Sequence, residues 1–255
     1  MRLCVTLPCH FPTGSTEEVC ASIRAVAALG YDAVEGYFWS GWDLPTVRAV
    51  LDECGVEFLS LVVPETRMTD PTYRDLWLKA LREACESASV LGAKKLITQV
   101  GPDTGAPRGQ QHAAIVETLV AAKPILEEYG VTVMPEPLNV KVNHPGYYLI
   151  SAEEAFAIVR EVDSPYVKIV YDIYHQQVTE GDIIPTVTKN MDSIAHLHAA
   201  GHPGRHELWE GELNYEYIFA AIDRAGYKGA CGLEYGALGN AVESLSEAMR
   251  RYGKA

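Results

Sequence analysis

The stretch GVTVMPEPLN, residues 130–139, contains the unit from which the fold can be predicted. Gly130 follows an amphipathic helical pattern and suits the left-handed conformation at a helix C-terminus, because glycine has no Cβ to clash. The apolar run of residues 131–135 is typical of a buried strand, and it delivers Glu136 between two prolines. The order of helix, glycine, strand and carboxylate predicts one unit of an α/β protein.

The same unit recurs along the chain. Glycines precede apolar stretches at four other places: Gly30 before YDAVEGYF, Gly55 before VEFLSLVV, Gly92 before AKKLITQV and Gly226 before YKGACGLEY. With LCVTL, VKIVYDIYH and IAHLHAA this makes eight predicted strands, each nearly continuous in apolar residues, as parallel strands covered by helices are. Eight units in 255 residues predict a single-domain (β/α)8 TIM barrel over residues 1–255. A doubly wound open sheet is the alternative, but no G-x-G-x-x-G follows the first strand.

Helix starts are also visible in the sequence. Ser15 and Ser151 are each followed three residues later by glutamate, which is the spacing of a capping box. Asp70 precedes a proline, an order typical of an N-cap followed by the first helical residue. We therefore predict that helices begin at these three places.

Composition limits the classes of function. A hydrophobic content of 48% with 22% charged residues is ordinary for a globular protein. The formal net charge of −13 argues against a nucleic-acid partner, which requires a basic surface. The first residues lack the apolar segment of a signal peptide, and no stretch approaches the roughly 18 apolar residues of a membrane span. Six scattered cysteines without a CxxC pair predict reduced thiols, so we expect a cytoplasmic protein with no membrane partner.

Polar residues stand at the ends of four consecutive predicted strands. These are Glu136, Asp172, His198 and Glu234. In a TIM barrel such residues meet at the catalytic mouth. Three carboxylates and an imidazole suit Mn²⁺, Mg²⁺ or Co²⁺ better than structural zinc, and a divalent cation lets all three carboxylates stay ionised. The alternative for each carboxylate taken singly is a helix N-cap or a solvated rim group.

The choice of histidine follows from the position in the strand. His196 and His198 point to the same side because they are two residues apart. We select His198 as the ligand because it is nearer the strand end, and we expect His196 to be a hydrogen-bonded core residue. Five residues near strand ends or in the following loops are weaker pocket candidates, better explained by packing at the rim: His10, Glu35, Trp39, Gln99 and Lys141.

These residues belong to a linked set of motifs, which are EPLN, HPGYYL, YDIYHQQVTEG, HLHAAGHPGRHE, GELNY and GLEYG in that order. The set resembles the hydroxypyruvate isomerase-like branch of the xylose isomerase-like TIM barrels, which also includes ketose 3-epimerases. The resemblance implies one divalent metal ion held by Glu136, Asp172, His198 and Glu234, with the two glutamates also acting as acid and base. It further implies that His175 and Arg205 contact substrate oxygens, and it suggests a homodimer or homotetramer.

The resemblance implies an isomerase that acts through an enediolate, most closely one that interconverts hydroxypyruvate and tartronate semialdehyde. Two features depart from hydroxypyruvate isomerases, which often carry Gln in place of His198 and usually Pro-Gly-Thr-Gly-Glu in place of LWEGE, residues 208–212. The planar, two-pronged guanidinium of Arg205 suits a substrate carboxylate. A loop-fixing ion pair with Glu207 or Glu210 is the alternative role for this arginine.

Three other functions are considered. A ketose 3-epimerase of the tagatose, psicose or ribulose type would use the same two glutamates. A metal-dependent phosphodiesterase would need more histidines and a basic groove, which the acidic composition disfavours. A non-catalytic sugar-binding barrel would bind its ligand without proton exchange. For the isomerase, the epimerase and the sugar-binding barrel, the expected partner is a small molecule, either a 2-oxo acid or a ketose.

Overall fold

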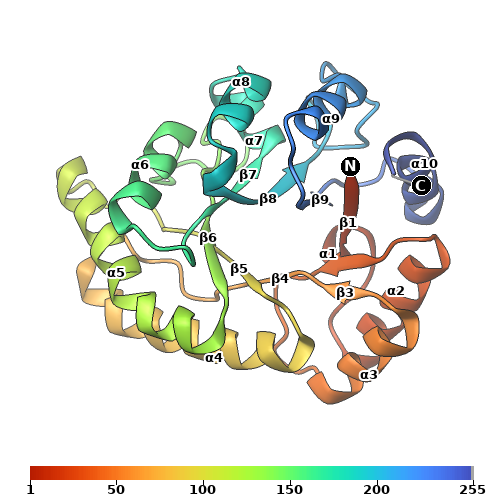
Figure 1. Ribbon diagram of the computed structural model, residues 1–255, viewed down its shortest axis with the longest axis horizontal. Coiled ribbons are helices and arrows are strands. Elements are labelled where there is room, and N and C mark those ends of the chain that lie inside the picture. Colours follow the sequence, from red (N-terminus) through yellow and green to blue (C-terminus); the bar gives the residue numbers. More distant parts are fainter. Residues whose placement is uncertain (254–255) are drawn as a thin grey trace.

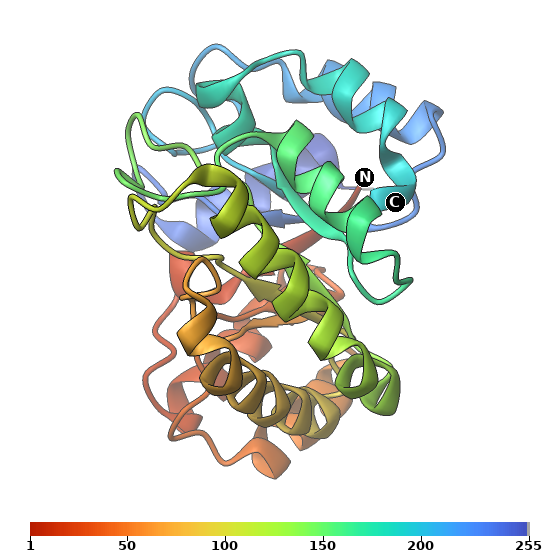
Figure 2. The same ribbon diagram turned by 90° about the vertical axis from the view of Figure 1, so that its left-hand side faces the viewer.

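The computed structural model describes residues 1–253, which form a ring of parallel strands enclosed by helices (Figure 1). The strands are β1 (Arg2–Thr6), β2 (Ala33–Glu35), β3 (Glu57–Phe58), β4 (Ser60–Val62), β5 (Lys95–Thr98), β6 (Thr132–Pro135), β7 (Ile169–Asp172), β8 (Ile194–Ala199) and β9 (Ala230–Leu233). The helices are α1 (Leu7–His10), α2 (Thr16–Ala28), α3 (Leu44–Cys54), α4 (Arg74–Leu91), α5 (Arg108–Tyr129), α6 (Ala152–Val162), α7 (Ile173–Thr179), α8 (Ile183–Lys189), α9 (Tyr215–Arg224) and α10 (Ala241–Tyr252), with 3-10 turns η1 (Pro71–Tyr73) and η2 (Met191–Ser193). Figure 2 shows α4, α5 and α6 packed side by side on the outside.

Pairing between neighbouring strands closes the ring. β1 pairs with both β2 and β9, and the pairing continues through β8 to β7. In the other direction β3 pairs with β2, while β4 pairs with β5 and β5 with β6. A parallel bridge between Val133 and Val167 joins β6 to the segment that leads into β7. The TIM barrel predicted from the sequence is confirmed.

Two of the predicted strands are shorter or less regular than expected. The third, residues 56–63, is divided into β3 and β4 at Leu59, whose N–H donates to the carbonyl oxygen of Val34 at 2.8 Å. The sixth, residues 167–175, ends at Asp172 because Asp172 Oδ1 accepts a hydrogen bond from the His175 N–H at 3.1 Å. That carboxylate starts α7 and leaves Oδ2 free to face the barrel mouth.

The three predicted helix starts are confirmed. The side chains of Ser15, Asp70 and Ser151 each accept a hydrogen bond from a backbone N–H two or three residues further on, at 2.9–3.2 Å. Glu154 does not complete a capping box with Ser151, because its carboxylate accepts a hydrogen bond from the Tyr148 hydroxyl at 2.9 Å instead. Glu18 likewise accepts from the Gly14 N–H at 2.8 Å, so the helices begin as predicted but both glutamates serve other contacts.

Alternation along the strands directs polar side chains toward the mouth. Two small apolar clusters are separate from the main core, which lies between the ring and the helices. One contains Met134 and Val170, and the other contains Cys4 and Ala230. Two residues after Met134 comes Glu136, and two after Val170 comes Asp172, so each pair shares one side of its strand. The carboxylates of Glu136 and Asp172 thus point to the same side of their strands as these apolar residues.

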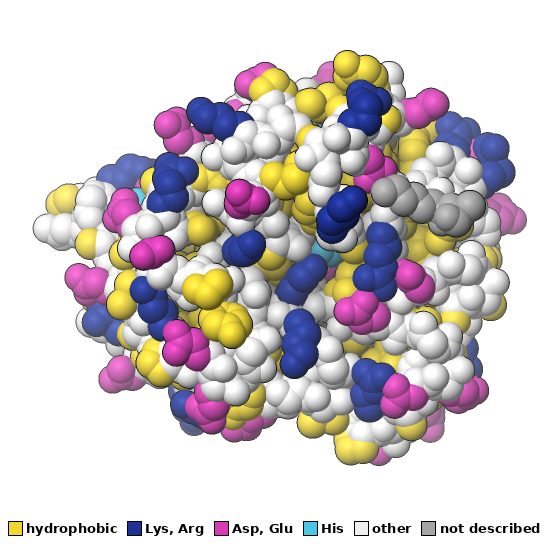
Figure 3. Space-filling view, in the orientation of Figure 1, with side chains coloured by type: hydrophobic (Ala, Val, Ile, Leu, Met, Phe, Trp, Pro, Cys, Tyr) yellow, Lys and Arg dark blue, Asp and Glu magenta, His cyan; other side chains and the backbone are white. Residues whose placement is uncertain are grey.

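The surface carries charges of both signs. On the face shown in Figure 3, Lys and Arg side chains are interspersed with Asp and Glu, and several basic groups lie near its centre. Within residues 1–253, no helix combines the length and the apolar character that crossing a bilayer requires.

Candidate active site

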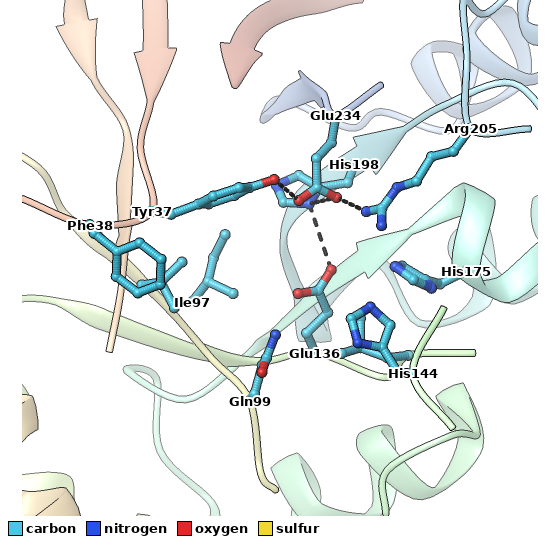
Figure 4. Close-up of a pocket in the computed structure, with 12 residues that line it drawn as sticks. Tyr37, Phe38, Ile97, Gln99, Glu136, His144, His175, His198, Arg205 and Glu234 are labelled. Atoms are coloured by element: carbon cyan, nitrogen blue, oxygen red, sulfur yellow. Dashed lines mark hydrogen bonds and ion pairs between the residues drawn. The ribbon is translucent and has the colours of Figure 1, made fainter. Parts of the chain in front are cut away.

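Glu136, Asp172, His198 and Glu234 come together at the C-terminal mouth of the barrel. One potential ligand atom from each lies within 4.8 Å of those of the other three, and all four side chains are buried. His198 Nδ1 lies 3.3 Å from Glu234 Oε2 and 3.6 Å from Glu136 Oε1 (Figure 4). The four strand-end residues selected from the sequence therefore form one cluster.

The backbone on both sides of Glu136 is held in place. Its N–H donates to the carbonyl oxygen of Thr98 at 3.1 Å, and its own carbonyl oxygen accepts from the Tyr147 hydroxyl at 2.9 Å. The carbonyl oxygen of Pro137 accepts from Gln176 Nε2 at 2.9 Å. Prolines are tolerated at this strand end because they need not donate to the ladder, and their restricted φ stiffens the frame.

Glu234 is held through both carboxylate oxygens. The Tyr37 hydroxyl donates to Oε1, and Arg205 donates to Oε2 from the opposite side (Figure 4). The same guanidinium nitrogen lies 3.6 Å from Asp172 Oδ2. Arg205 therefore faces the cluster, where it neutralises part of the negative charge.

The alternative role considered for Arg205, an ion pair with Glu207 or Glu210, is wrong. Its partners are the two cluster carboxylates, and its guanidinium also lies 5.2 Å from the centre of the Tyr174 ring. Glu207 instead accepts a hydrogen bond from the Leu238 N–H at 3.0 Å. The loop is fixed by other contacts, so Arg205 remains available to the pocket.

His175 lies beside the cluster and lines the pocket. Its Nδ1 accepts a hydrogen bond from the Asn139 backbone N–H at 3.2 Å, which leaves the ring proton on Nε2. Nε2 lies 3.6 Å from Asp172 Oδ2 and has no hydrogen-bond partner within the described chain. Burial, with the nearby charge of Arg205, lowers the pKa of His175 well below its usual value. A neutral imidazole that can donate from Nε2 suits contact with a substrate oxygen.

Burial and charge set the ionisation of the cluster. Burial raises the pKa of Asp172 to about 7 and also raises the pKa of Glu136, which the nearby charge of Glu234 raises further. Burial acts in the same direction on Glu234, but His198 and Arg205 outweigh it, so the pKa of Glu234 is lowered. Positive charge added nearby would therefore favour the ionised forms of Asp172 and Glu136.

The residues present fit a divalent cation. Glu136 Oε1 and His198 Nδ1 are buried, face each other, and have no hydrogen-bond partner in residues 1–253. Buried polar atoms are normally paired, so an unpaired carboxylate oxygen that faces an unpaired imidazole nitrogen indicates a missing electrophile between them. Three carboxylates and one imidazole are donors that Mn²⁺, Mg²⁺ or Co²⁺ accept.

Glu35 lies beneath the cluster and is almost fully buried, at 1% exposure. Its carboxylate accepts from Thr6 Oγ1 at 2.5 Å and from Ser60 Oγ at 2.8 Å, and it lies 2.9 Å from His196 Nε2 and 3.1 Å from His198 Nε2. The expected place of Glu35 at the rim is therefore wrong. The prediction that His196 is a hydrogen-bonded core residue is confirmed.

Gly232 of β9 provides the space for this carboxylate. A Cβ at this position would overlap Glu35 Oε1 and lie 2.8 Å from His198 Cδ2. We expect Gly232→Ala to lower the free energy of unfolding by about 1–3 kcal/mol, because a hydrogen-bonded buried carboxylate has little room to move. Urea denaturation followed by circular dichroism measures the change.

Gly109, at the start of α5, is the matched control. No atom lies within 4 Å of a Cβ added there, and its backbone is helical. Gly109→Ala should leave the stability unchanged or raise it by up to about 1 kcal/mol. Equal stability of the two alanine variants would contradict the tight packing around Gly232.

A pocket of about 250 Å³ opens beside the cluster. Its other walls are Tyr37, Phe38, Val62, Ile97, Gln99, Leu138 and His144. Of the weaker candidates from the sequence, Gln99 lines this pocket, whereas His10, Trp39 and Lys141 do not. Sequence reasoning missed Tyr37 and His144; Tyr37 follows Glu35 at the spacing of one strand side, and His144 begins the HPGYYL motif. The pocket therefore combines charged and polar groups with apolar side chains.

Known proteins resemble this chain over most of its length. The family model described as xylose isomerase-like TIM barrel matches residues 23–253. A 2-oxo-tetronate isomerase from Cupriavidus necator is 37% identical over 83% of this chain and 84% of its own, and a hydroxypyruvate isomerase from Escherichia coli is 31% identical over 84% and 86%. The two curated relatives are thus named as isomerases of small 2-oxo acids.

Solved structures share the fold. A structure described as AP endonuclease, family 2, from Brucella melitensis superposes with a TM-score of 0.87 at 27% identity, over 91% of this chain and 93% of the other. A D-allulose 3-epimerase from Methylomonas sp. reaches a TM-score of 0.81 at 20% identity, over 99% and 90%. From the fold, the match to the family model and the identity to both relatives, the chain belongs to the xylose isomerase-like TIM barrel family, in its hydroxypyruvate isomerase-like branch.

Proposed function

We propose that this protein is a metal-dependent isomerase of a small 2-oxo acid. Hydroxypyruvate, which would be converted to tartronate semialdehyde, and 2-oxo-tetronate are the substrates that the relatives' names suggest. The observation that carries the proposal is the buried cluster of Glu136, Asp172, His198 and Glu234 beside a pocket that Arg205 enters. The pocket volume suits a molecule of three or four carbons.

Isomerisation moves a proton between the carbinol carbon and the neighbouring carbonyl carbon. One glutamate carboxylate removes the proton from the carbinol carbon, and the electron pair forms a carbon–carbon double bond while negative charge develops on the former carbonyl oxygen. Delivery of a proton to that former carbonyl carbon completes the aldehyde when a proton also moves from the adjacent hydroxyl to the former carbonyl oxygen, which becomes a hydroxyl. Glu136 and Glu234 project from different strands toward one point, as an acid and a base on two sides of a substrate should (Figure 4).

Glu136, Asp172, His198 and Glu234 would hold the divalent cation. Mn²⁺, Mg²⁺ or Co²⁺ would supply Lewis-acid stabilisation of the charge that develops on the substrate oxygens. Tyr37 orients Glu234 by its hydrogen bond to Oε1, and Tyr147 anchors the backbone of Glu136. These tyrosines reduce the reorganisation that proton transfer requires.

Arg205 is proposed to bind the substrate carboxylate. We expect Arg205→Met to raise KM for a 2-oxo acid by about 10–100-fold, because a hydrogen bond to a charged group contributes about 1.5–3 kcal/mol. Arg205→Lys should recover only part of the affinity, since lysine retains the charge but loses the planar fork. Initial-rate kinetics measure both. The KM for a ketose, which has no carboxylate, should rise much less. An equal rise in KM for the 2-oxo acid and the ketose would contradict this role of Arg205.

Deuterium exchange tests the proposed function directly. Protein loaded with Mn²⁺ or Mg²⁺ is incubated in D₂O with hydroxypyruvate, tartronate semialdehyde, 2-oxo-tetronate or a panel of ketoses. NMR or mass spectrometry then follows the label, with a fast chelator quench for the Mn²⁺ samples. We expect metal-dependent incorporation at the carbon next to the carbonyl of a 2-oxo acid. No metal-dependent exchange with any of these substrates would refute the enediolate mechanism for this range.

The same experiment separates the alternatives. A ketose 3-epimerase would exchange the C3 proton and leave the ketone in place, whereas the isomerase converts ketone to aldehyde. A sugar-binding barrel would bind without exchange. A phosphodiesterase acting on nucleic acid is disfavoured by the formal charge of −13.

Two further expectations from the sequence accompany this proposal. We infer a cytoplasmic location and a homodimer or homotetramer. Light scattering coupled to size-exclusion chromatography measures the assembly, and fractionation of the native cell measures the location.

A further inference from the structure

We propose that Glu35 is a positioning residue that orients His198 toward the cation. The inference rests on the proposed cation site and goes beyond it, because Glu35 lies outside the four ligands and does not line the pocket. It begins from the position of the His198 ring, which lies between two sets of carboxylates. Nε2 is 3.1 Å from Glu35 Oε1, and Nδ1 is 3.3 Å from Glu234 Oε2.

An imidazole that binds a cation through one nitrogen carries its proton on the other. A carboxylate next to Nε2 stabilises the proton there and so leaves the Nδ1 lone pair for the cation. Glu35 is the carboxylate on that side of His198. It thereby selects the form of the imidazole that presents Nδ1 to Glu136 and Glu234.

Glu35 can hold this position because its own carboxylate is fixed. Oε1 accepts from the Thr6 hydroxyl at 2.5 Å, and Oε2 accepts from Ser60 Oγ at 2.8 Å and lies 2.9 Å from His196 Nε2. These groups come from β1, β4 and β8, so three other strands of the barrel position one carboxylate. The absence of a Cβ at Gly232 leaves the space it occupies.

A second cation site is the competing explanation. Glu35, His196 and His198 have potential ligand atoms within 4.8 Å of one another, which a cation also requires. However, the Glu35 carboxylate already has two hydroxyl donors and the His196 ring around it. Direct contacts therefore satisfy this group, in contrast to the unpaired Glu136 Oε1 above it. Binding stoichiometry separates the two explanations.

The test is calorimetric titration of Mn²⁺ into the metal-free full-length protein and its Glu35→Gln variant. Gln retains the size of Glu but lacks the charge that stabilises a proton on Nε2 of His198. We expect wild type to bind one Mn²⁺ and the variant to bind it about 10–100-fold more weakly, which is the usual cost of losing a partner of a metal-ligating histidine. Circular dichroism and the melting temperature verify that both proteins are folded.

Ser60→Ala is the matched control. It removes one donor to Glu35 but leaves the carboxylate and its contact with His198. We expect its Kd for Mn²⁺ to stay within about twofold of wild type, whereas a general loosening of the buried network would weaken Ser60→Ala and Glu35→Gln alike. Equal weakening of the two variants would overturn the inference, as would a stoichiometry of two Mn²⁺ in wild type.

A second measurement needs no variant of Glu35 and covers the case in which Glu35→Gln does not fold. Wild-type protein labelled with ¹⁵N-histidine and loaded with diamagnetic Zn²⁺ is examined by long-range ¹H–¹⁵N NMR, with His198 assigned from its loss in His198→Asn. We expect a protonated Nε2 and a metal-bound Nδ1. The reverse arrangement would overturn the inference.

The outcomes distinguish this inference from the proposed function. If wild type binds Mn²⁺ and exchanges deuterium while Glu35→Gln keeps the wild-type Kd, the role of Glu35 is refuted and the isomerase proposal stands. If wild type binds Mn²⁺ with the expected dependence on Glu35 but exchanges no substrate proton, the positioning role stands and the reaction is refuted. Wild type that binds no Mn²⁺ refutes both.

Discussion

Glu136→Gln is expected to reduce metal-dependent proton exchange by about 10²–10⁴-fold, the usual contribution of a positioned acid or base. The amide retains the shape of the side chain and one oxygen, but it cannot accept and return a proton at neutral pH. Burial and the neighbouring charge of Glu234 raise the pKa of the Glu136 carboxyl, which brings it nearer to the operating pH and strengthens it as a base. The rate of deuterium incorporation into hydroxypyruvate or 2-oxo-tetronate measures the effect.

Glu117→Gln on the outer surface of α5 is the control for this substitution. Glu117 pairs with Arg74 of α4, is largely exposed and does not line the pocket, so the Glu117→Gln variant should exchange at the wild-type rate. Titration with Mn²⁺ shows whether Glu136→Gln still binds the cation at the concentration used. A saturated Glu136→Gln protein that exchanges at more than about a tenth of the wild-type rate would exclude Glu136 as an essential proton carrier.

Removal of the divalent cation is expected to abolish exchange and to lower thermal stability together. At a concentration of 100 times its Kd, a ligand that binds only the folded state stabilises it by about 2.7 kcal/mol. For a chain of this size that corresponds to a rise of about 5–10 °C in melting temperature. Dialysis against EDTA, followed by addition of Mn²⁺, Mg²⁺ or Co²⁺, measures both quantities and identifies the preferred ion.

Asp172→Asn separates specific binding from a general effect of salt. The substitution removes one charged ligand, although the amide oxygen can still cap α7 in the place of Oδ1. We expect the folded variant to show little rise in melting temperature at a Mn²⁺ concentration that protects wild type. Equal protection of both proteins, or full activity after exhaustive chelation, would contradict the cation site.

The barrel and the positions of the four cluster residues could be predicted from the sequence for a simple physical reason. Strand residues two apart point to the same side, and parallel strands in a barrel end at the same face. For a polar residue that ends an apolar run, such as Glu234 in CGLE, the pattern therefore predicts two things. It predicts the side of the strand to which the side chain points and its position at the C-terminal face of the barrel. His175 was reached through the resemblance, and the structure locates it beside Asp172.

The remaining site residues depend on geometry that a linear pattern does not contain. Glu35 is paired with Thr6 of the neighbouring strand. Because barrel strands tilt by about 36° to the barrel axis, two paired residues lie at different heights along that axis. For that reason Glu35 lies below the mouth. Tyr37 and Arg205 lie in loops, where no periodicity fixes the direction of a side chain. Their contacts with Glu234 could be found only from the folded chain.

The second half of the barrel carries all four proposed ligands, at the ends of β6 to β9, and the first half supplies Tyr37, Phe38, Val62 and Gln99 to the opposite wall of the pocket. The wall that faces the ligands is therefore encoded in a different stretch of the chain from the ligands themselves. A chimera that joins a relative's first half, with Glu35 and Tyr37 retained, to residues 131–253 would change that wall and keep the four ligands, His175 and Arg205.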